Sequence, residues 1–201
     1  EGNKVCYNTT GAVTRVLDGE QERVVEGLRS IGDKVTGMNA TGPHDLAFTA
    51  DGSLYLIIGL GADPSVREEN EAGGPSQLGK LFRVDPETGD LTEIADVAGY
   101  ETENNPDGGL IDSNPFMLAV GPDGSLAVTD AGANALYRVD LDGTITPLAI
   151  FPDRAELMPD SSVEVPMNAV PTGLWLGPED SFYVGQLTGF PFPVGGANVY
   201  R

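Results

Sequence analysis

Oxygen-bearing side chains crowd the stretch "YETENNPDGGLIDSNP", which covers residues 100–115, and another aspartate follows at Asp130. Carboxylate and amide oxygens are the ligands that Ca²⁺ prefers. A bound cation polarises an ester carbonyl and lowers the pKa of a bound water. A calcium-dependent hydrolase is therefore one interpretation. Its candidate ligands are Glu103, Asn105, Asp107, Asp112, Asn114 and Asp130.

The elements that must position these groups are repeated. The phrases "LAFTADGSLYLII", "LAVGPDGSLAVTD" and "LWLGPEDSFYVGQ" align on Leu46, Leu118 and Leu174. Two of them place Asp-Gly between alternating apolar runs, which is the strongest short-range signal for a β-hairpin. The third has Glu-Asp at the same point. The sequence therefore predicts three equivalent hairpins.

A second phrase follows each hairpin and places an arginine at one point of a strand. "KLFRVD", "ALYRVD" and "NVYR" contain Arg83, Arg138 and Arg201, and "AVTRVLD" near the start contains Arg15. Two of the phrases turn through "DPETGD" or "DLDGT" into a further strand. Four short antiparallel strands per repeat are typical of a β-propeller blade. We therefore predict an all-β fold with about three and a half blades.

The repeats divide the chain, which we take as a single propeller domain over 1–201 or as part of one. We expect a half blade at 11–28, blades at 44–97 and 116–151, and a partial blade at 172–201. Propellers close with about four to eight blades, and an open ring exposes strand edges. Two explanations remain open: the sequence is part of a longer product, or separate copies complete one another's ring by edge pairing.

Long connections should share one face of this disc, because the strands within each blade alternate in direction. These connections are 29–43, 59–79, 98–115, 152–171 and 185–197. Loops on a rigid scaffold often bind ligands. Strand starts should ring the channel mouth with His44, Phe116 and Thr172. The candidate binding residues are His44, Asn105, Asp107, Asp112, Asn114, Asp130, Thr172 and Gln186.

Catalysis by a nucleophilic triad receives little support. His44 is the only histidine, its neighbour Asp45 points to the opposite face of the strand, and no GxSxG motif occurs. We interpret His44 as a structural imidazole that forms a hydrogen bond between blades, with a ligand contact at the channel mouth as the alternative. Trp175 is expected in the core, and the single cysteine, Cys6, is expected to be a buried thiol.

Acidic residues outnumber basic ones by 31 to 11, which gives a formal net charge of −20. Such a field repels nucleic acid and anionic lipid and favours cationic partners. No apolar run approaches the roughly 20 residues of a membrane-spanning helix. Glycosylation-type triplets at Asn8 and Asn39 favour an extracellular or exported protein, whose signal peptide is absent from this sequence or already removed.

Several phrases, among them "ATGPHDLAF", "YETENNPDGG", "DAGANALYRVD" and "LTGFPFPVGGANVYR", resemble the ScyD/ScyE family over nearly the whole chain. These are secreted or exported propeller proteins related to NHL-repeat folds. The resemblance implies a propeller with about six blades in the complete ring. It implies no activity and no catalytic residues.

Two functions are consistent with these observations. The first is a secreted non-catalytic propeller that acts as a binding or assembly scaffold through its long-loop face, with a protein or small-molecule ligand, no cofactor, no nucleic acid and no membrane insertion. The alternative is a Ca²⁺-dependent lactonase or esterase similar to the gluconolactonase class. Those lactonases resemble one another in a "PNG" at the start of the innermost strand. Here that place holds His44, Phe116 or Thr172.

Overall fold

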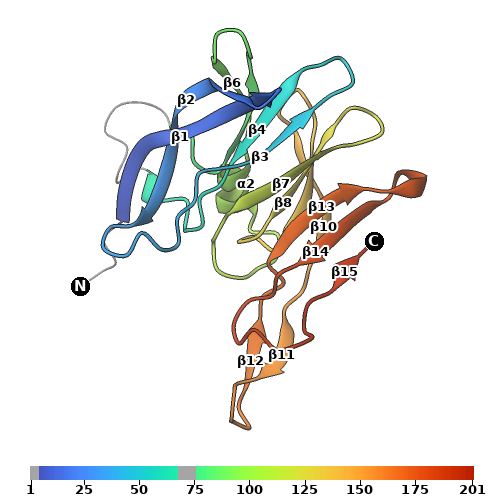
Figure 1. Cartoon of the computed structure of the whole chain (residues 1–201). Coiled ribbons are helices and arrows are strands. Elements are labelled where there is room, and N and C mark those ends of the chain that lie inside the picture. Colours follow the sequence, from blue (N-terminus) through green and yellow to red (C-terminus); the bar gives the residue numbers. More distant parts are fainter. Residues whose placement is uncertain (1–4, 68–75) are drawn as a thin grey trace.

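Antiparallel sheets make up almost all of the regular structure. The structure is a computed structural model that describes residues 5–67 and 76–201. Two sheets have four strands each in chain order, and a third has three (Figure 1). Their strands are β3 (Pro43–Phe48), β4 (Leu54–Ile58), β5 (Lys80–Val84) and β6 (Leu91–Asp96); β7 (Pro115–Val120), β8 (Leu126–Asp130), β9 (Ala135–Val139) and β10 (Ile145–Ile150); and β13 (Pro171–Leu176), β14 (Phe182–Gln186) and β15 (Val199–Tyr200). This is the predicted all-β, propeller-like architecture of four-stranded antiparallel blades.

The three repeated hairpins lie on equivalent elements, as predicted. Leu46, Leu118 and Leu174 fall in β3, β7 and β13, which are the first strands of the three sheets. Gly52 and Gly124 have φ of 83° and 84° in the turns that follow β3 and β7. Only glycine adopts this conformation without strain, so the Asp-Gly pairs fix where each hairpin reverses.

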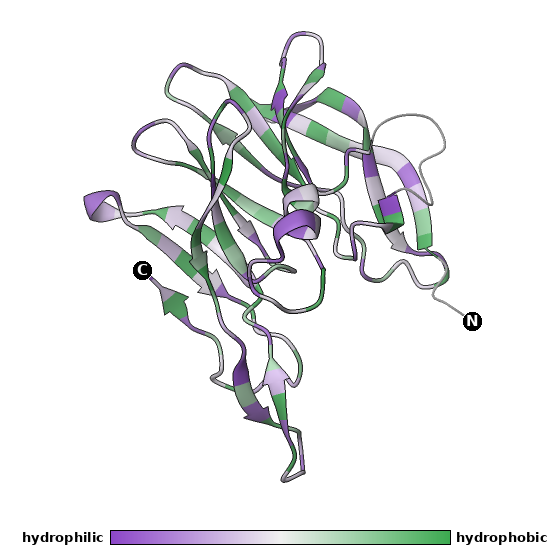
Figure 2. Cartoon of the chain, turned by 180° about the vertical axis from the view of Figure 1, so that it is seen from behind, coloured by the Kyte–Doolittle hydropathy of each residue, from purple (hydrophilic) through white to green (hydrophobic). Residues whose placement is uncertain are grey.

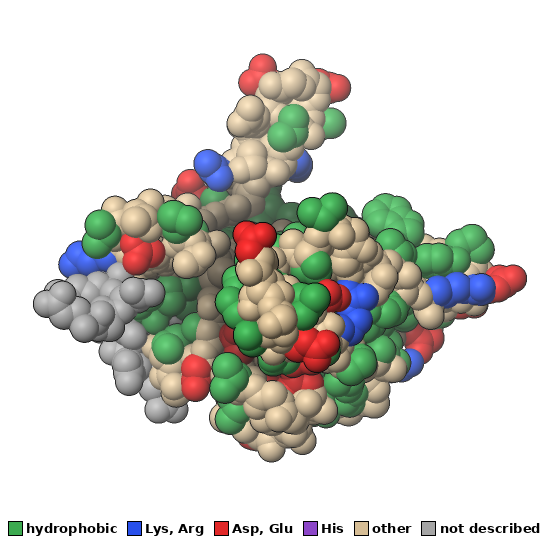
Figure 3. Space-filling model, turned by 90° about the horizontal axis from the view of Figure 1, so that it is seen from below, with side chains coloured by type: hydrophobic (Ala, Val, Ile, Leu, Met, Phe, Trp, Pro, Cys, Tyr) green, Lys and Arg blue, Asp and Glu red, His purple; other side chains and the backbone are tan. Residues whose placement is uncertain are grey.

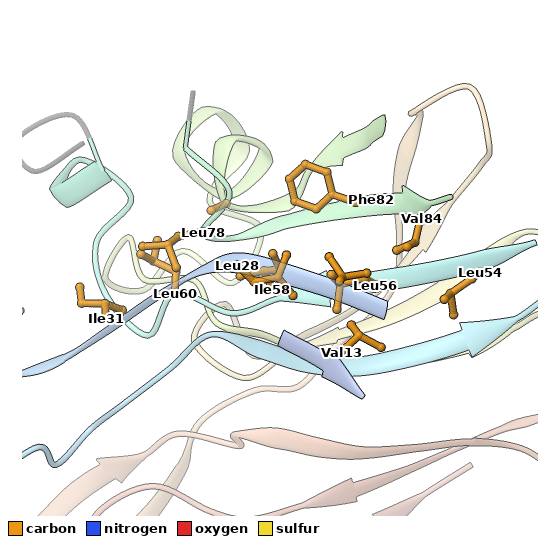
Figure 4. Packing of buried hydrophobic residues seen from close by; sticks show 12 residues of the cluster. Val13, Leu28, Ile31, Leu54, Leu56, Ile58, Leu60, Leu78, Phe82 and Val84 are labelled. Atoms are coloured by element: carbon orange, nitrogen blue, oxygen red, sulfur yellow. The ribbon is translucent and has the colours of Figure 1, made fainter. Parts of the chain in front are cut away.

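The sheets pack face to face around apolar layers. One layer joins the β3–β6 sheet to a two-stranded sheet of β1 (Val5–Leu17) and β2 (Glu20–Asp33), and Figure 4 shows Val13, Leu28, Leu54 and Leu56 within it. A second layer, which includes the fully buried Tyr137, joins the two four-stranded sheets. A third joins the β7–β10 sheet to the three-stranded sheet. Burial of alternating apolar side chains therefore stacks the sheets as an arc.

Two of the predicted loops contain regular structure. The helix α2 (Val97–Asn104) lies in the segment expected to be a loop at 98–115, and its N-cap, Asp96, accepts a hydrogen bond from the Gly99 amide at 2.7 Å. In Figure 2 the helix lies in front of the sheets, and part of its ribbon has the purple colour of hydrophilic residues. The strands β11 (Arg154–Leu157) and β12 (Glu164–Met167) pair as an arm that projects from the body (Figure 1).

The interpretation of Cys6 as a buried thiol is wrong. Cys6 lies near the start of β1, and its side chain is exposed. The β1–β2 sheet buries only one face, so the apolar character of a residue in β1 does not decide its burial. Among the described residues, no helix is long and apolar enough to cross a membrane.

Candidate functional site

Hydrogen bonds join several of the long connections, which we call the loop layer. The Gly59 amide donates to the Gly42 carbonyl at 2.8 Å, and the Gly61 amide donates to the Ser113 carbonyl at 2.9 Å. Further along the arc, the Leu187 amide donates to the Val170 carbonyl at 3.0 Å. Connections from different sheets therefore hold one another in place. Figure 3 shows this side of the molecule from below, with acidic side chains spread across it.

Asp130 is the best-anchored side chain in this layer. It is fully buried at the end of β8, and its Oδ1 accepts hydrogen bonds from the amides of Asn114, Gly132 and Ala133 at 2.7, 3.0 and 3.1 Å. Its Oδ2 accepts a hydrogen bond from the Ser113 hydroxyl at 2.6 Å. Burial raises the pKa of Asp130 to about 6, although these hydrogen bonds lower it. Asp130 therefore joins the segment just before β7, at Ser113 and Asn114, to the turn between β8 and β9.

Glu101 lies on the buried side of α2 and was not among the predicted site residues. Its side chain is sealed from solvent, and neither carboxylate oxygen has a hydrogen-bond partner among the described residues. Burial, together with the negative charges of Asp130, Asp107 and Asp112, raises the pKa of Glu101 to about 7. The nearby Tyr137 hydroxyl lowers this pKa only slightly. Sequence analysis missed Glu101 because residues 98–115 were expected to form a loop. The signal that could have indicated a helix here is the N-cap residue Asp96.

The other predicted calcium ligands serve the local structure. Asp107 accepts hydrogen bonds from the Gly109 amide at 2.8 Å and from Asn134 Nδ2 at 2.9 Å. Asn105 is the left-handed C-cap of α2 and donates from Nδ2 to the Gly109 carbonyl. Asn114 Oδ1 accepts a hydrogen bond from the Leu60 amide at 3.2 Å.

These groups do not converge on one point. Glu103 is exposed on α2, whereas Asp112 is half-buried and burial raises the pKa of its carboxyl. Within residues 5–67 and 76–201, no three His, Cys, Asp or Glu side chains are placed to hold a metal ion. The carboxylates of the predicted calcium set therefore form no such three-residue cluster in the described part of the chain.

The predicted channel-mouth residues His44 and Gln186 form hydrogen bonds within the fold, as the candidate ligands above do. His44 Nδ1 donates to the Pro115 carbonyl at 2.9 Å, and its ring packs on Phe116 with centroids 4.6 Å apart. Burial lowers the pKa of His44, so the imidazole is neutral at pH 7. This confirms a structural imidazole that links two sheets. Gln186 is buried and accepts a hydrogen bond from the Tyr200 hydroxyl at 3.1 Å, whereas Thr172 is half-buried at the start of β13.

An open apolar groove, which we call the inner groove, runs along the first strands of the three sheets. It encloses about 350 Å³ and is lined by residues 45–48 of β3, 117–120 of β7 and 174–176 of β13. Trp175 is 74% exposed in it and Phe48 is 65% exposed. The prediction that Trp175 belongs to the core is wrong, because no sheet covers its face of β13.

Two kinds of chemistry follow from this geometry. Buried and hydrogen-bonded carboxylates hold the loop layer rigid, and the inner groove offers aromatic surface of the kind that anchors protein contacts. A nucleophile beside a base, as covalent catalysis requires, is not formed around His44, whose ring contacts are Pro115 and Phe116.

Comparisons with known proteins found similarities among solved structures only. Neither the family models nor the curated proteins include a match. Among solved structures, a catalytically inactive virginiamycin B lyase from Staphylococcus aureus with quinupristin aligns over 98% of this chain and 59% of its own, with 16% identity and a TM-score of 0.48. A streptogramin B lyase aligns over 94% and 53%, with 15% identity and a TM-score of 0.44. A selenomethionine-substituted virginiamycin B lyase from the same organism has 14% identity, a TM-score of 0.37 and coverage of 98% and 74%. This chain thus spans less than two thirds of the first two.

Proposed function

We propose that this chain is an exported, non-catalytic scaffold that assembles through the inner groove. The resemblance to the ScyD/ScyE family supports export and the propeller type. The occupant that we propose is a second copy of the chain. The observation that carries the proposal is the exposure of Trp175 and Phe48 at the two ends of one arc of sheets. The hydrogen-bonded loop layer remains available for a further ligand.

The two ends lack neighbours for a simple geometric reason. Leu46 and Phe48 pair with Leu56 and Leu54, so they lie on the face of the β3–β6 sheet that packs against β1–β2. Because the β1–β2 sheet has only two strands, it leaves this part of β3 uncovered. At the other end, Trp175 pairs with Tyr183 on the face of the last sheet that points away from the β7–β10 sheet. Two copies arranged head to tail around a twofold axis would cover both faces.

Assembly is expected to bury the only tryptophan of the chain, Trp175. Raising the protein concentration should therefore produce a dimer in sedimentation velocity and a blue shift of tryptophan emission over the same range. Added salt should strengthen the dimer, because each copy carries a formal charge of −20. Trp175→Ser should weaken the dimer by about tenfold or more, as loss of a central aromatic anchor does.

The matched control is Leu141→Ser, which changes an exposed apolar residue in the turn after β9 and should leave assembly unchanged. A monomer at all concentrations, with tryptophan emission typical of a solvated ring, would contradict the proposed assembly.

A separate measurement tests the calcium-dependent hydrolase. The chain should show no turnover of an ester and lactone panel that depends on added Ca²⁺, because the predicted oxygen ligands are hydrogen-bonded locally or do not converge. Turnover that a chelator abolishes and Ca²⁺ restores would contradict the non-catalytic scaffold and support the lactonase or esterase.

A further inference from the structure

Equivalent arginines in the two four-stranded sheets have different partners. Arg138 of β9 is held by two carboxylates: its Nε and Nη2 donate to Asp140 Oδ1 at 2.9 and 2.7 Å, and its Nη1 donates to Asp123 Oδ2 at 2.5 Å. Arg83 of β5 occupies the same place in "FRVD" that Arg138 occupies in "YRVD". Its Nη2 donates to the Ser53 hydroxyl at 3.2 Å, and no carboxylate of the described residues forms an ion pair with it.

Thr49 accounts for the first missing partner. Asp51 is the counterpart of Asp123, but the Thr49 hydroxyl and the Ser53 amide donate to its Oδ1 at 2.6 and 3.1 Å. The Ser53 hydroxyl donates to its Oδ2 at 3.2 Å. In the second sheet Gly121 stands in place of Thr49, and Ser125 uses Oδ1 of Asp123 alone, so Oδ2 of Asp123 is free for Arg138.

The longer turn after β5 explains why the second carboxylate, Asp85, does not pair with Arg83. Asp85 Oδ1 accepts hydrogen bonds from the amides of Glu87 and Thr88 at 2.8 and 3.2 Å and so shapes the turn to β6. In the shorter turn after β9 a different residue, Asp142, accepts from the Thr144 amide at 3.0 Å. The counterpart of Asp85, Asp140, is therefore available to Arg138. The sequence difference between "DPETGD" and "DLDGT" releases Arg83.

An open cleft of about 440 Å³ lies beside the released guanidinium, between the turn after β3 and the turn after β5. Its polar lining combines one cation with several anions and hydroxyls: Arg83, Asp51, Ser53, Asp85, Glu87 and Thr92. Within the described part of the chain, neither Asp85 nor Glu87 forms a salt bridge. The cleft therefore holds an unpaired cation and unpaired anions within one small volume.

We propose that this cleft binds a small zwitterion, a ligand that carries both a carboxylate and an ammonium group. The carboxylate takes the place opposite Arg83 that Asp123 takes opposite Arg138, where a guanidinium offers two parallel donors. The ammonium faces Glu87 and Asp85. A bare carboxylate is disfavoured, because the cleft and the whole chain are acidic. This site lies on the turns, away from the inner groove, and does not depend on the proposed scaffold function.

Three related peptides test the proposal: triglycine, N-acetyl-triglycine and triglycine amide. They carry both charges, the carboxylate alone and the ammonium alone. We expect triglycine to shift the amide resonances of Ser53 and Glu87 in an NMR titration. Each blocked peptide should bind about tenfold or more weakly, since each loses one charge-assisted contact. Binding of the amide as tight as that of triglycine would overturn the proposal, as would the absence of any shift with triglycine.

Two variants test the residues. Arg83→Gln should weaken triglycine binding by about tenfold or more, whereas Arg23→Gln, which removes an equally exposed arginine from β2, should leave it unchanged. Thr49→Ala should also weaken binding, because the Ser53 hydroxyl can then move to Asp51 Oδ1, as Ser125 does on Asp123, and this frees Asp51 Oδ2 to pair with Arg83. Equal binding by Arg83→Gln and the unchanged chain would overturn the site. Tighter binding by Thr49→Ala would overturn the explanation for its formation.

Discussion

Asp130→Ala is expected to lower the free energy of unfolding by about 3 to 5 kcal/mol at pH 7. Alanine removes the acceptor for three backbone amides and for the buried Ser113 hydroxyl, and the Ala133 amide and this hydroxyl are then buried without a partner. The loss should be measured by urea denaturation followed by circular dichroism. We expect the loops at 112–114 and 131–134 to lose hydrogen-exchange protection first.

Asp130→Asn is the matched control. Its amide oxygen replaces Oδ1 as an acceptor, so we expect a loss well below that of the alanine variant. The same small loss in both variants would show that the hydrogen bonds of Asp130 contribute little to the loop layer.

Glu101→Gln is expected to stabilise the protein above about pH 7. The pKa of Glu101 rises from its usual 4.5 to about 7 in the folded chain. Between pH 4.5 and pH 7 the folded state therefore binds more protons than the unfolded state. Stability therefore falls as the pH rises through this window, by up to about 3 kcal/mol. This figure is the largest loss that we expect. Glutamine forms no anion and avoids the loss.

Denaturation midpoints of both proteins should be compared from pH 4.5 to pH 8. The two should be close at the acid end and diverge toward pH 8, with the variant more stable. Glu103→Gln is the control, because it removes an exposed carboxylate from the same helix and should follow the unchanged chain. A parallel pH dependence of Glu101→Gln and the unchanged chain would show that Glu101 is not the group that titrates.

Local sequence was sufficient for the hairpins but not for the long connections. The hairpins could be predicted because Asp-Gly turns and alternating apolar residues act within a dozen positions. The helix α2 and the arm of β11 and β12 were missed, because their stretches carry Gly, Pro and Asn in a pattern typical of loops. The one local signal for α2 is Asp96 placed before Val97, an N-cap that the glycine at Gly99 obscured.

The candidate site was predicted at the level of its neighbourhood only. Asp107, Asp112, Asn114 and Asp130 do belong to the loop layer, but the sequence could not show that backbone amides and Asn134 already occupy Asp107 and Asp130. Nor could it show that Glu101 is buried on the inner side of α2, because Asp130 and Tyr137, which lie near it, come from other strands.

By itself, the sequence determined the repeating hairpins, their register at Leu46, Leu118 and Leu174, and the acidic charge of the chain. These depend on turn chemistry and on side-chain alternation, which are local or additive properties. Only the tertiary structure decided which faces are covered, and so exposed Trp175 and sealed Glu101. It also decided that Arg138 is paired and Arg83 is not, although both occupy the same place in the repeat. Burial and ion pairing depend on which neighbouring sheet or turn supplies a partner. The residues of a repeated phrase do not determine which sheet or turn that is.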